Sequence, residues 1–303
     1  MVVSAARASL AYHRPVITVS IDGTIVPAEQ ASISVFDRGL LYGDGCFEVL
    51  RTWDGVAVEL AAHLDRLYAT AAWLRLRIIE RTKLEEAVYR TIAAAQTHVP
   101  PIEPQTRPEH RIRIVVTRGP GGLAQPFADL GGGRAIVIVE PLPPPPTELS
   151  LAIVDWPISA SGSHKTLAFL DPLIARELAR AAGADEAVRL DPAGHVVEGG
   201  TCNLFLVARG AVATPRLVPG VLPGIVRARV LSLCAGETIS ATEREVSITD
   251  LREADEVFVT SSLRGVVPVT RLDNLPRACG PITALLARSY ARSMRPVRSL
   301  PVI

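Results

Sequence analysis

The amino-acid sequence predicts a two-lobed protein of the α/β or α+β class. The chain has 303 residues and 48% of them are apolar, which is long for a single compact core. Alternating patterns typical of strands and longer patterns typical of helices occur in both halves. The proline run PLPPPPT separates these halves, and it can continue neither a helix nor a strand ladder. We expect a loose N-terminal extension at 1–14, a small α/β domain at 15–140, a proline-rich linker at 141–147 and a larger domain at 148–303.

Strands and two amphipathic helices make up the predicted first lobe. Residues 16–21 alternate in polarity and end at Asp22-Gly23, as in a strand that leads into a hairpin turn. Residues 45–53 are a second strand, in which alternation places Phe47, Val49 and Arg51 on one face. The remaining elements are helices at 60–76 and 82–98 and strands at 111–118 and 134–140.

The predicted second lobe also mixes strands and helices. The last of its helices has Gly280-Pro281 at its start, and proline is tolerated in a first helical turn. We expect strands near 149–155, 186–190, 203–207 and 256–260, and helices at 171–182, 224–234 and 281–292.

Charge and cysteine usage exclude several classes of protein. The formal net charge is +1, from 32 basic and 31 acidic side chains, which argues against a nucleic-acid-binding surface. The sequence shows no apolar targeting segment in residues 1–15 and no stretch of the ~20 apolar residues that a membrane span needs. The four cysteines contain no C-x-x-C pair, which favours a cytoplasmic protein without metal.

Lysine chemistry has only two candidate residues in this chain, Lys83 and Lys165. Lys83 lies in RTKLEE, on the polar face of a predicted helix. Lys165 lies in SGSHKTL, among small and hydroxyl-bearing residues just after the strand that begins the second lobe. We therefore expect Lys83 to be a surface cation and Lys165 to lie in a pocket.

Three further segments after Lys165 carry polar or charged groups that could bind a charged ligand. Glu198 lies between an apolar pair and Gly199-Gly200, where a buried carboxylate would need a cationic partner. In PGVLPGIVRARVL the free amides of Ile225 and Val226 would begin a helix, and such amides bind phosphate. The strand EVFVTSSLRG ends in hydroxyls, including that of Ser262. A lysine, a carboxylate for a ring nitrogen and a phosphate cradle are the groups that pyridoxal phosphate requires.

These residues resemble those of the class IV (fold type IV) pyridoxal-phosphate enzymes. That family includes branched-chain aminotransferases, D-amino acid aminotransferases and 4-amino-4-deoxychorismate lyases. The similar segments follow the family's order over roughly residues 16–275. They are FDRGLLYGDGCFEVLRT, HLDRLYATA, RIVVTRGPGG, HKTL, DEAVRLDPAGHVVEGGTCNLFLV, GVLPGIVR and EVFVTSSLRGVVPV.

The resemblance implies a role for each matching residue. Lys165 would form the Schiff base with pyridoxal 5'-phosphate and move the substrate α-proton, and Glu198 would bind the pyridine nitrogen. The phosphate would be bound by Arg66, by the amides of Ile225 and Val226 and by Ser262. Position 226 usually carries threonine, so a hydroxyl is lost here. The resemblance also implies a homodimer, with the cofactor in the cleft between a small and a larger lobe.

The subfamily features are mixed. The lyases resemble this chain at YGDGCF, but Val49 stands where they often have a threonine associated with elimination. D-amino acid aminotransferases resemble FEVLRT and HLDRLYATA, but their Arg-x-His is replaced by GPGGLAQPF. Branched-chain enzymes share Tyr42, Phe47 and Arg51 with this chain, yet they usually have glycine at position 49.

A substrate with a carboxylate needs a cation, and Arg51 and Arg264 are the candidates because both lie on segments that line the site in this family. We expect an aminotransferase that moves an amino group between an amino acid and a 2-keto acid, with D-amino acids favoured and (R)-amines as further donors. The alternatives are an aminodeoxychorismate lyase, a branched-chain aminotransferase and a non-catalytic phosphate-ligand-binding protein.

Overall fold

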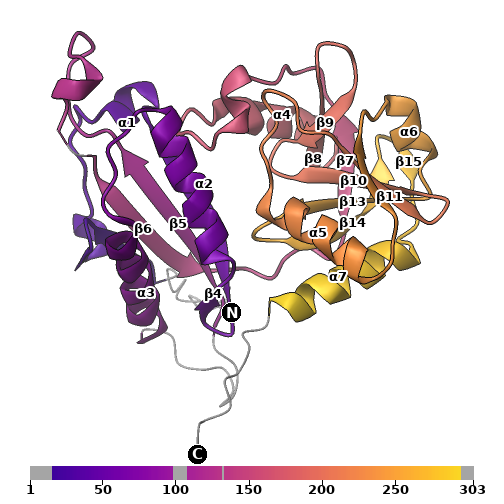
Figure 1. The fold of residues 1–303 in the computed structure, drawn as a ribbon, viewed down its shortest axis with the longest axis horizontal. Helices are drawn as coiled ribbons and strands as arrows, with labels where there is room; N and C mark the ends of the chain where they lie inside the picture. Colours follow the sequence, from indigo (N-terminus) through magenta and orange to yellow (C-terminus); the bar gives the residue numbers. More distant parts are fainter. Residues whose placement is uncertain (1–15, 98–107, 132, 295–303) are drawn as a thin grey trace, which may run out of the picture.

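The computed structural model describes residues 16–97, 108–131 and 133–294. Two lobes lie side by side (Figure 1), and each is built on its own sheet. The predicted two-lobed mixture of strands and helices is therefore confirmed. The segment 142–148 connects strand β6, which ends at Pro141, to strand β7, which begins at Leu149. The expected extension at 1–14 lies outside the described residues.

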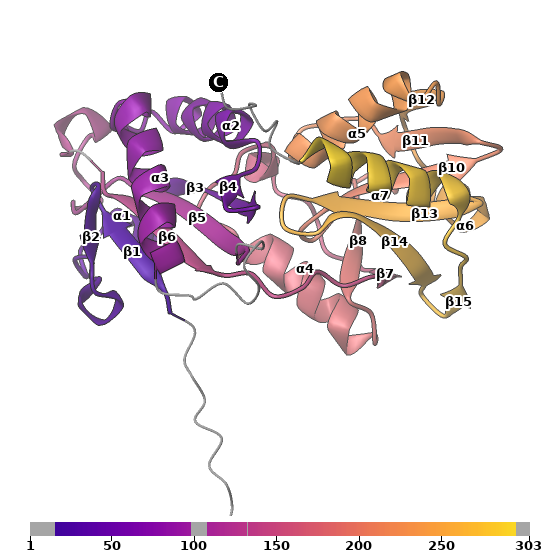
Figure 2. The ribbon, with the colours of Figure 1, turned by 90° about the horizontal axis from the view of Figure 1, so that it is seen from below.

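The first lobe has a six-stranded sheet in which all neighbouring strands pair antiparallel, in the order β2-β1-β6-β5-β3-β4. Two helices, α2 (Leu60–Trp73) and α3 (Arg81–Thr97), cover one face of it (Figure 2). A short helix, α1 (Arg38–Tyr42), precedes the third strand. The strands are β1 (Thr18–Ile21), β2 (Thr24–Val26), β3 (Gly45–Trp53), β4 (Val56–Ala57), β5 (His110–Thr117) and β6 (Ala135–Pro141).

Side chains alternate along β3 and β5, so one face of these strands packs in the core of the lobe and the other face does not. Leu50 and Ile112 pack under the helices with Leu64 and Leu67, and all four are fully buried or nearly so. The opposite face carries Phe47 and Val49 on β3. In the β3–β5 register, Val49 pairs with Arg113 and Phe47 with Val115. This second face lines a cavity between the lobes.

The second lobe has a nine-stranded sheet in the order β12-β11-β10-β13-β14-β7-β8-β9, with β15 paired to β14. Helices α5 (Ile225–Gly236) and α7 (Pro281–Ser293) pack on Phe205 and Phe258 at one face, and α4 (Leu170–Ala181) packs beside β7 and β8. Helix α6 (Ile248–Glu253) precedes β13. The strands are β7 (Leu149–Ile153), β8 (Glu186–Leu190), β9 (Val196–Gly199), β10 (Asn203–Ala208), β11 (Ala211–Pro215), β12 (Ala241–Arg244), β13 (Glu256–Ser261), β14 (Gly265–Leu272) and β15 (Leu275–Pro276).

The predicted strands and helices all occur, with ends shifted by three residues or fewer, but several elements were not predicted. Strand β14 is one of these, because Pro268 interrupts its pattern and proline is uncommon within a sheet. Strand β9 is only four residues long, so its alternation is too brief to recognise.

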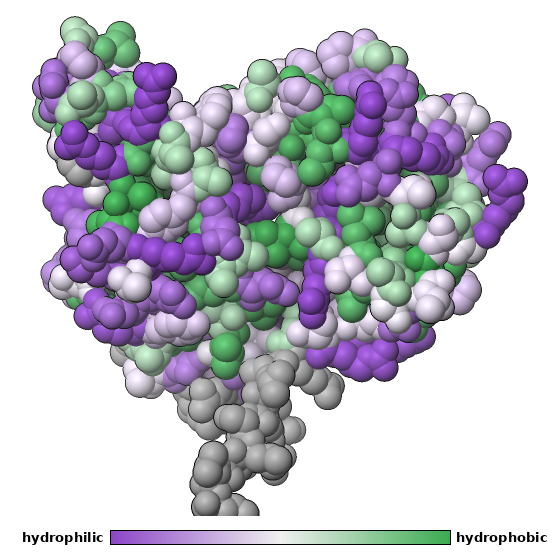
Figure 3. Space-filling model, viewed as in Figure 1, coloured by the Kyte–Doolittle hydropathy of each residue, from purple (hydrophilic) through white to green (hydrophobic). Residues whose placement is uncertain are grey.

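No helix in the described ranges has the length and apolarity needed to cross a membrane. Figure 3 shows polar and apolar residues mixed over one face, with apolar residues also where the lobes meet.

Candidate active site

A cavity of about 500 Å³ lies between the lobes. The first lobe contributes residues of β3, α2 and β5, and the second contributes β9, the start of α5 and the turn after β13. The segment that contains Lys165 also lines it. The cavity brings together nine of the eleven predicted site residues, namely Phe47, Val49, Arg66, Lys165, Glu198, Ile225, Val226, Ser262 and Arg264.

Lys165 lies in residues 164–169, a segment without helix that precedes α4 and is hydrogen-bonded to strand β3. This segment is called the strap below. The Lys165 carbonyl accepts a hydrogen bond of 2.9 Å from the amide of Phe47, and the amide of Leu167 donates to Gly45 at 2.9 Å. The Lys165 Nζ atom lies 4.7 Å from the centre of the Phe47 ring and 5.1 Å from that of Phe169. Burial lowers the pKa of Lys165 to about 8. At pH 7 about one-tenth of the amine is then neutral, far more than for an ordinary lysine.

Lys83 has a different setting, on the outside of α3. Its Nζ atom pairs with Glu80 at 3.3 Å, and both side chains are about 70% exposed (69% and 72%). The structure thus separates the two lysines as the sequence predicts.

Glu198 is buried in β9 and lines the cavity. Its Oε2 atom accepts a hydrogen bond of 3.2 Å from the amide of Leu222, and its Oε1 atom lies 3.5 Å from Arg189 Nη1. Burial raises the pKa of Glu198 to about 8, because neither contact is short enough to offset the loss of hydration. The buried carboxyl group therefore holds a proton more readily than an exposed one and can share that proton with a nitrogen base.

Arg66 is held by a buried network with Glu48 and His63, which was not predicted from the sequence. Its Nε and Nη2 atoms donate to the two carboxylate oxygens of Glu48 at 2.7 and 2.8 Å. Glu48 also contacts His63 Nδ1 at 2.7 Å. Burial opposes ionisation of Glu48, but the hydrogen bonds from Arg66 and His63 outweigh it and lower its pKa to about 2. The sequence did indicate that His63 and Arg66 could bind one group together, because they are three residues apart and share one helix face.

Arg66 also reaches the N-terminus of α5, where an anion cradle is formed. Its Nη1 atom donates to the carbonyl of Pro223 at 2.9 Å. Helix α5 begins after Gly224, so the amides of Ile225 and Val226 have no acceptor within the helix. A Cβ atom on Gly224 would lie 1.9 Å from Asn203 Oδ1, so any other residue here would force the Asn203 side chain or the loop to move. The buried hydroxyl of Thr260, which also lines the cavity, has no hydrogen-bond partner among the described residues.

Two predicted substrate contacts, Tyr42 and Arg51, do not line the cavity in this chain. Tyr42 lies on α1, 46% exposed, with the Arg38 guanidinium 5.0 Å from its ring centre. Arg51 lies beyond Val49 on β3, and its guanidinium donates to the carbonyls of Thr52 at 3.0 Å and Leu263 at 3.3 Å.

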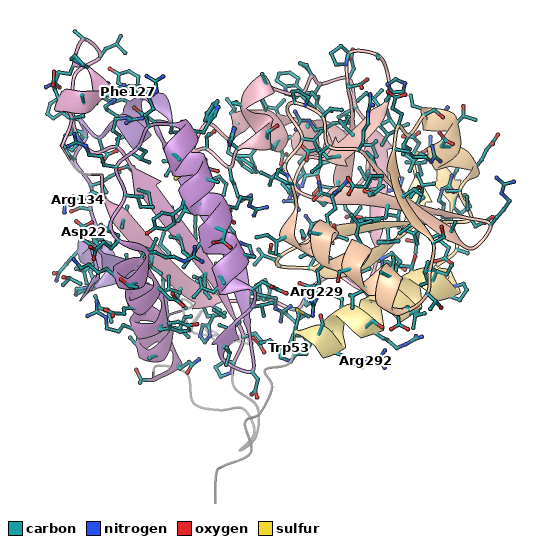
Figure 4. The ribbon with its side chains drawn as sticks, viewed as in Figure 1. Asp22, Trp53, Phe127, Arg134, Arg229 and Arg292 are labelled. Atoms are coloured by element: carbon teal, nitrogen blue, oxygen red, sulfur yellow. The ribbon has the colours of Figure 1, made fainter. Side chains whose placement is uncertain are left out.

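Those backbone carbonyls draw the head group of Arg51 away from the cavity. Its guanidinium carbon lies 5.3 Å from the centre of the Trp53 ring, and Trp53 stands at the lower edge of the lobe junction (Figure 4). Arg264 does line the cavity, but its Nη2 atom is bonded to Thr201 Oγ1 at 2.6 Å and to Glu186 Oε2 at 3.1 Å.

A lysine with a lowered pKa, a buried carboxyl group and an anion cradle around one interlobe cavity define a class of enzyme that works on amines with a phosphate-bearing cofactor. Comparison with known proteins identifies the family. Residues 45–272 match the model of the amino-transferase class IV family. The chain belongs to that family, and the predicted family and enzyme class are confirmed.

Individual relatives agree with this assignment. A putative branched-chain-amino-acid aminotransferase of Methanocaldococcus jannaschii is 34% identical over 84% of this chain and 88% of its own length. A D-alanine aminotransferase of Bacillus licheniformis is 26% identical over 88% of this chain and 93% of its own length. Among solved structures, the branched-chain aminotransferase of Thermoproteus uzoniensis with norvaline has a TM-score of 0.83 at 29% identity, covering 91% of this chain and 93% of its own.

A second solved structure was determined with a bound cofactor form. This branched-chain amino acid aminotransferase with pyridoxamine 5'-phosphate has a TM-score of 0.82 at 27% identity, covering 91% of this chain and 93% of its own.

Proposed function

We propose that this class IV aminotransferase moves the amino group of a D-amino acid to a 2-keto acid in two stages, with pyridoxal 5'-phosphate as cofactor. The observation that carries the proposal is the arrangement around Lys165. An amine with a pKa of about 8, a buried carboxyl group with a raised pKa and a helix N-terminus face one cavity. Each matches one part of the cofactor: its aldehyde, its ring nitrogen and its phosphate.

The residues of the cavity fit this cofactor. Arg66, the Ile225 and Val226 amides and Ser262 would hold the phosphate, and the orphan hydroxyl of Thr260 supplies a further donor. Glu198 would hold the ring nitrogen. When bound, pyridoxal 5'-phosphate supplies an aldehyde that takes up amino groups and a ring that spreads negative charge.

Lys165 would act as the base at the substrate α-carbon. Its neutral amine can accept a proton at neutral pH. Phe47 and Phe169 flank the amine and exclude water from its surroundings. Removal and return of the proton by one amine requires that the amine stay close to the reacting carbon, which the hydrogen bonds between the strap and β3 secure.

Val49 supports transfer from a D-amino acid over the alternatives. It lines the cavity and carries no hydroxyl, so it cannot assist a leaving group as a threonine would. Its branched side chain also narrows a position where branched-chain enzymes usually have glycine. The similarity to D-alanine aminotransferases over most of the chain supports the same choice.

Transfer from branched-chain L-amino acids is the second candidate. The Methanocaldococcus relative and the Thermoproteus structure favour it. So does the apolar part of the cavity wall, which includes Phe47, Leu142 and the four prolines at 143–146.

A single-turnover assay distinguishes these candidates. The cofactor-loaded enzyme is mixed with D-alanine or L-leucine in the absence of a keto acid. The proposal predicts that D-alanine removes the visible absorbance of the bound cofactor and that 2-oxoglutarate restores it. A response to L-leucine alone would establish the second candidate. Release of pyruvate from aminodeoxychorismate, with no response to either amino acid, would favour the lyase.

We also propose that the enzyme is a homodimer. Large apolar side chains are exposed on and just before α1, including Phe36 at 68% and Leu40 at 61%, and a second copy of the chain would cover them. Light scattering should give twice the chain mass of 32.4 kDa. A mass of one chain would overturn this part of the proposal.

A further inference from the structure

Arg189 lies beside Glu198 on the neighbouring strand of the second-lobe sheet. The two residues are paired in the antiparallel β8–β9 ladder, so their side chains lie on the same face of the sheet. Arg189 is 2% exposed, and it lines the cavity together with Glu198. Its Nη1 atom lies 3.5 Å from Glu198 Oε1. A buried cation therefore adjoins the carboxyl group that the proposed function assigns to the ring nitrogen.

A second contact fixes the direction of the Arg189 guanidinium. Its Nη2 atom donates a hydrogen bond of 2.8 Å to the backbone carbonyl of Pro157, which lies between β7 and the strap. Its buried Nε atom has no hydrogen-bond partner among the described residues. Because a guanidinium is planar and rigid, the bond to Pro157 holds the Nη1 edge toward Glu198.

The charges around Glu198 act on its ionisation in opposite directions. Burial opposes ionisation most strongly, and Glu186 on β8 opposes it too, whereas Arg189 and Lys165 favour it. Arg189 is the stronger of these two cations in its effect on the pKa of Glu198. Asp171, in the first turn of α4, in turn favours the charged form of Arg189. Lys165 has a pKa of about 8, but an arginine stays charged near neutral pH, so Glu198 depends mainly on Arg189.

The charge of Arg189 affects where a shared proton lies. A carboxyl group and a pyridine nitrogen in contact share one proton, and a buried carboxyl group tends to keep it. A cation beside the carboxyl group stabilises the carboxylate, so the proton passes to the ring nitrogen. A protonated ring accepts negative charge more readily, which is the property that amino transfer requires of the cofactor.

We propose that Arg189 is a positioning residue, which holds Glu198 as a carboxylate directed at the cofactor ring and so keeps the proton on the ring nitrogen. The proposal rests on the proposed function, since it concerns the cofactor of the same site. Arg189 acts through Glu198 and touches neither the reacting amine nor the phosphate cradle. It is the basic residue of the strand EAVRL, and its role depends on the pairing of β8 with β9.

The first test measures what the ring nitrogen contributes to cofactor binding. 1-Deaza-pyridoxal 5'-phosphate has a carbon atom in place of that nitrogen but keeps the aldehyde and the phosphate. Equilibrium titration of the apoenzyme gives the Kd of both compounds for wild type, Arg189→Gln, Arg189→Lys and the control Arg111→Gln. Arg111 also lines the cavity, but its exposed guanidinium pairs with Glu140.

Arg189→Gln should reduce the preference for pyridoxal 5'-phosphate over the deaza compound about tenfold, which corresponds to a change of about one in the pKa of Glu198. The Kd of the deaza compound should stay within about threefold, because no ring nitrogen is present. Arg189→Lys keeps the charge and should keep the preference within about threefold of wild type, as should the control. A lost preference in Arg189→Lys would contradict a role for the charge.

A double-mutant cycle tests whether Arg189 acts through Glu198. Arg189→Gln should slow the single-turnover reaction with D-alanine about tenfold and leave the KM within about twofold. In a Glu198→Gln background the same substitution should slow the reaction less than about twofold, because the carboxylate is already absent. A purely structural role for Arg189 would slow both backgrounds equally.

The binding test separates this inference from the proposed function. An equal preference for the nitrogen-bearing cofactor in wild type and Arg189→Gln would overturn the inference, even if the enzyme transfers amino groups. If the preference falls in Arg189→Gln but no amino acid reacts with the wild-type enzyme, the proposed function fails and the role of Arg189 at the ring nitrogen stands.

Discussion

Replacement of Glu48 by glutamine tests the buried network behind Arg66. Glu48 is fully buried and accepts three hydrogen bonds or ionic contacts, two from Arg66 and one from His63. Glutamine has nearly the same shape but no charge, so the largely buried Arg66 guanidinium would lose its counter-ion. We expect the apoprotein to lose stability and Arg66 to lose its fixed orientation toward Pro223.

The size of the loss follows from two independent arguments. A pKa of about 2 in the folded protein, against the ordinary value of 4.5, corresponds to about 3 kcal/mol of stabilisation at neutral pH. Removal of one partner from a buried ion pair typically costs about 3–5 kcal/mol. Both arguments predict a loss of about 3 kcal/mol for Glu48→Gln at pH 7.

The pH dependence of the loss has a definite sign. Because folding lowers the pKa of Glu48, its contribution is fully present above pH 4.5 and disappears as the pH falls toward 2. The gap in unfolding free energy between wild type and Glu48→Gln should therefore shrink over that interval.

Urea unfolding of the apoprotein, followed by circular dichroism, measures this difference. Asp65→Asn is the matched control, since Asp65 is the neighbour of Arg66 on α2 but pairs with Arg81 at an exposed position. The control should change stability by less than about 1 kcal/mol. Equal unfolding midpoints for Glu48→Gln and wild type at pH 7 would refute the reasoning about the network.

Three further predictions concern the cofactor site. Gly224→Ala should weaken pyridoxal 5'-phosphate binding at least about fivefold in equilibrium titration, since its Cβ atom would meet Asn203 Oδ1 at 1.9 Å; unchanged affinity would show that the cradle tolerates a shift. Glu198→Gln should slow the single-turnover reaction about 100-fold in stopped flow, whereas an unchanged rate would remove Glu198 from the ring-nitrogen site. The rate of cofactor attachment to the apoenzyme should rise about tenfold per pH unit up to pH 8 and then level off. The reason is that Lys165 reacts as the neutral amine and its pKa is about 8. A rate that still rises above about pH 9 would contradict the lowered pKa.

Much of the site could be predicted from the sequence because its members lie in short segments with their own local signals. Lys165 stands among small residues, Glu198 precedes two glycines, and Gly224 begins a helix. Each of these signals spans only a few residues of sequence. The mixed class of both lobes likewise follows from patterns within single strands and helices.

The remaining contacts depend on how distant segments come together. Arg113 faces Val49 only because β3 and β5 pair in one particular register, across more than 60 residues of chain. Alternation correctly placed Arg51 on the face of Phe47, but it could not show where so long a side chain directs its head group. Its position is set by the carbonyls of Thr52 and of Leu263, and Leu263 belongs to the other lobe.

Identification of the residue that holds the cofactor tests the central claim most directly. The described chain offers two lysines, Lys83 on the surface of α3 and Lys165 in the cavity. The enzyme is loaded with pyridoxal 5'-phosphate, reduced with borohydride and digested, and the modified peptide is sequenced by mass spectrometry. We predict a single cofactor adduct on Lys165 and none in Lys165→Ala. An adduct on Lys83, or undiminished labelling of Lys165→Ala, would contradict the assignment of this cavity as the active site.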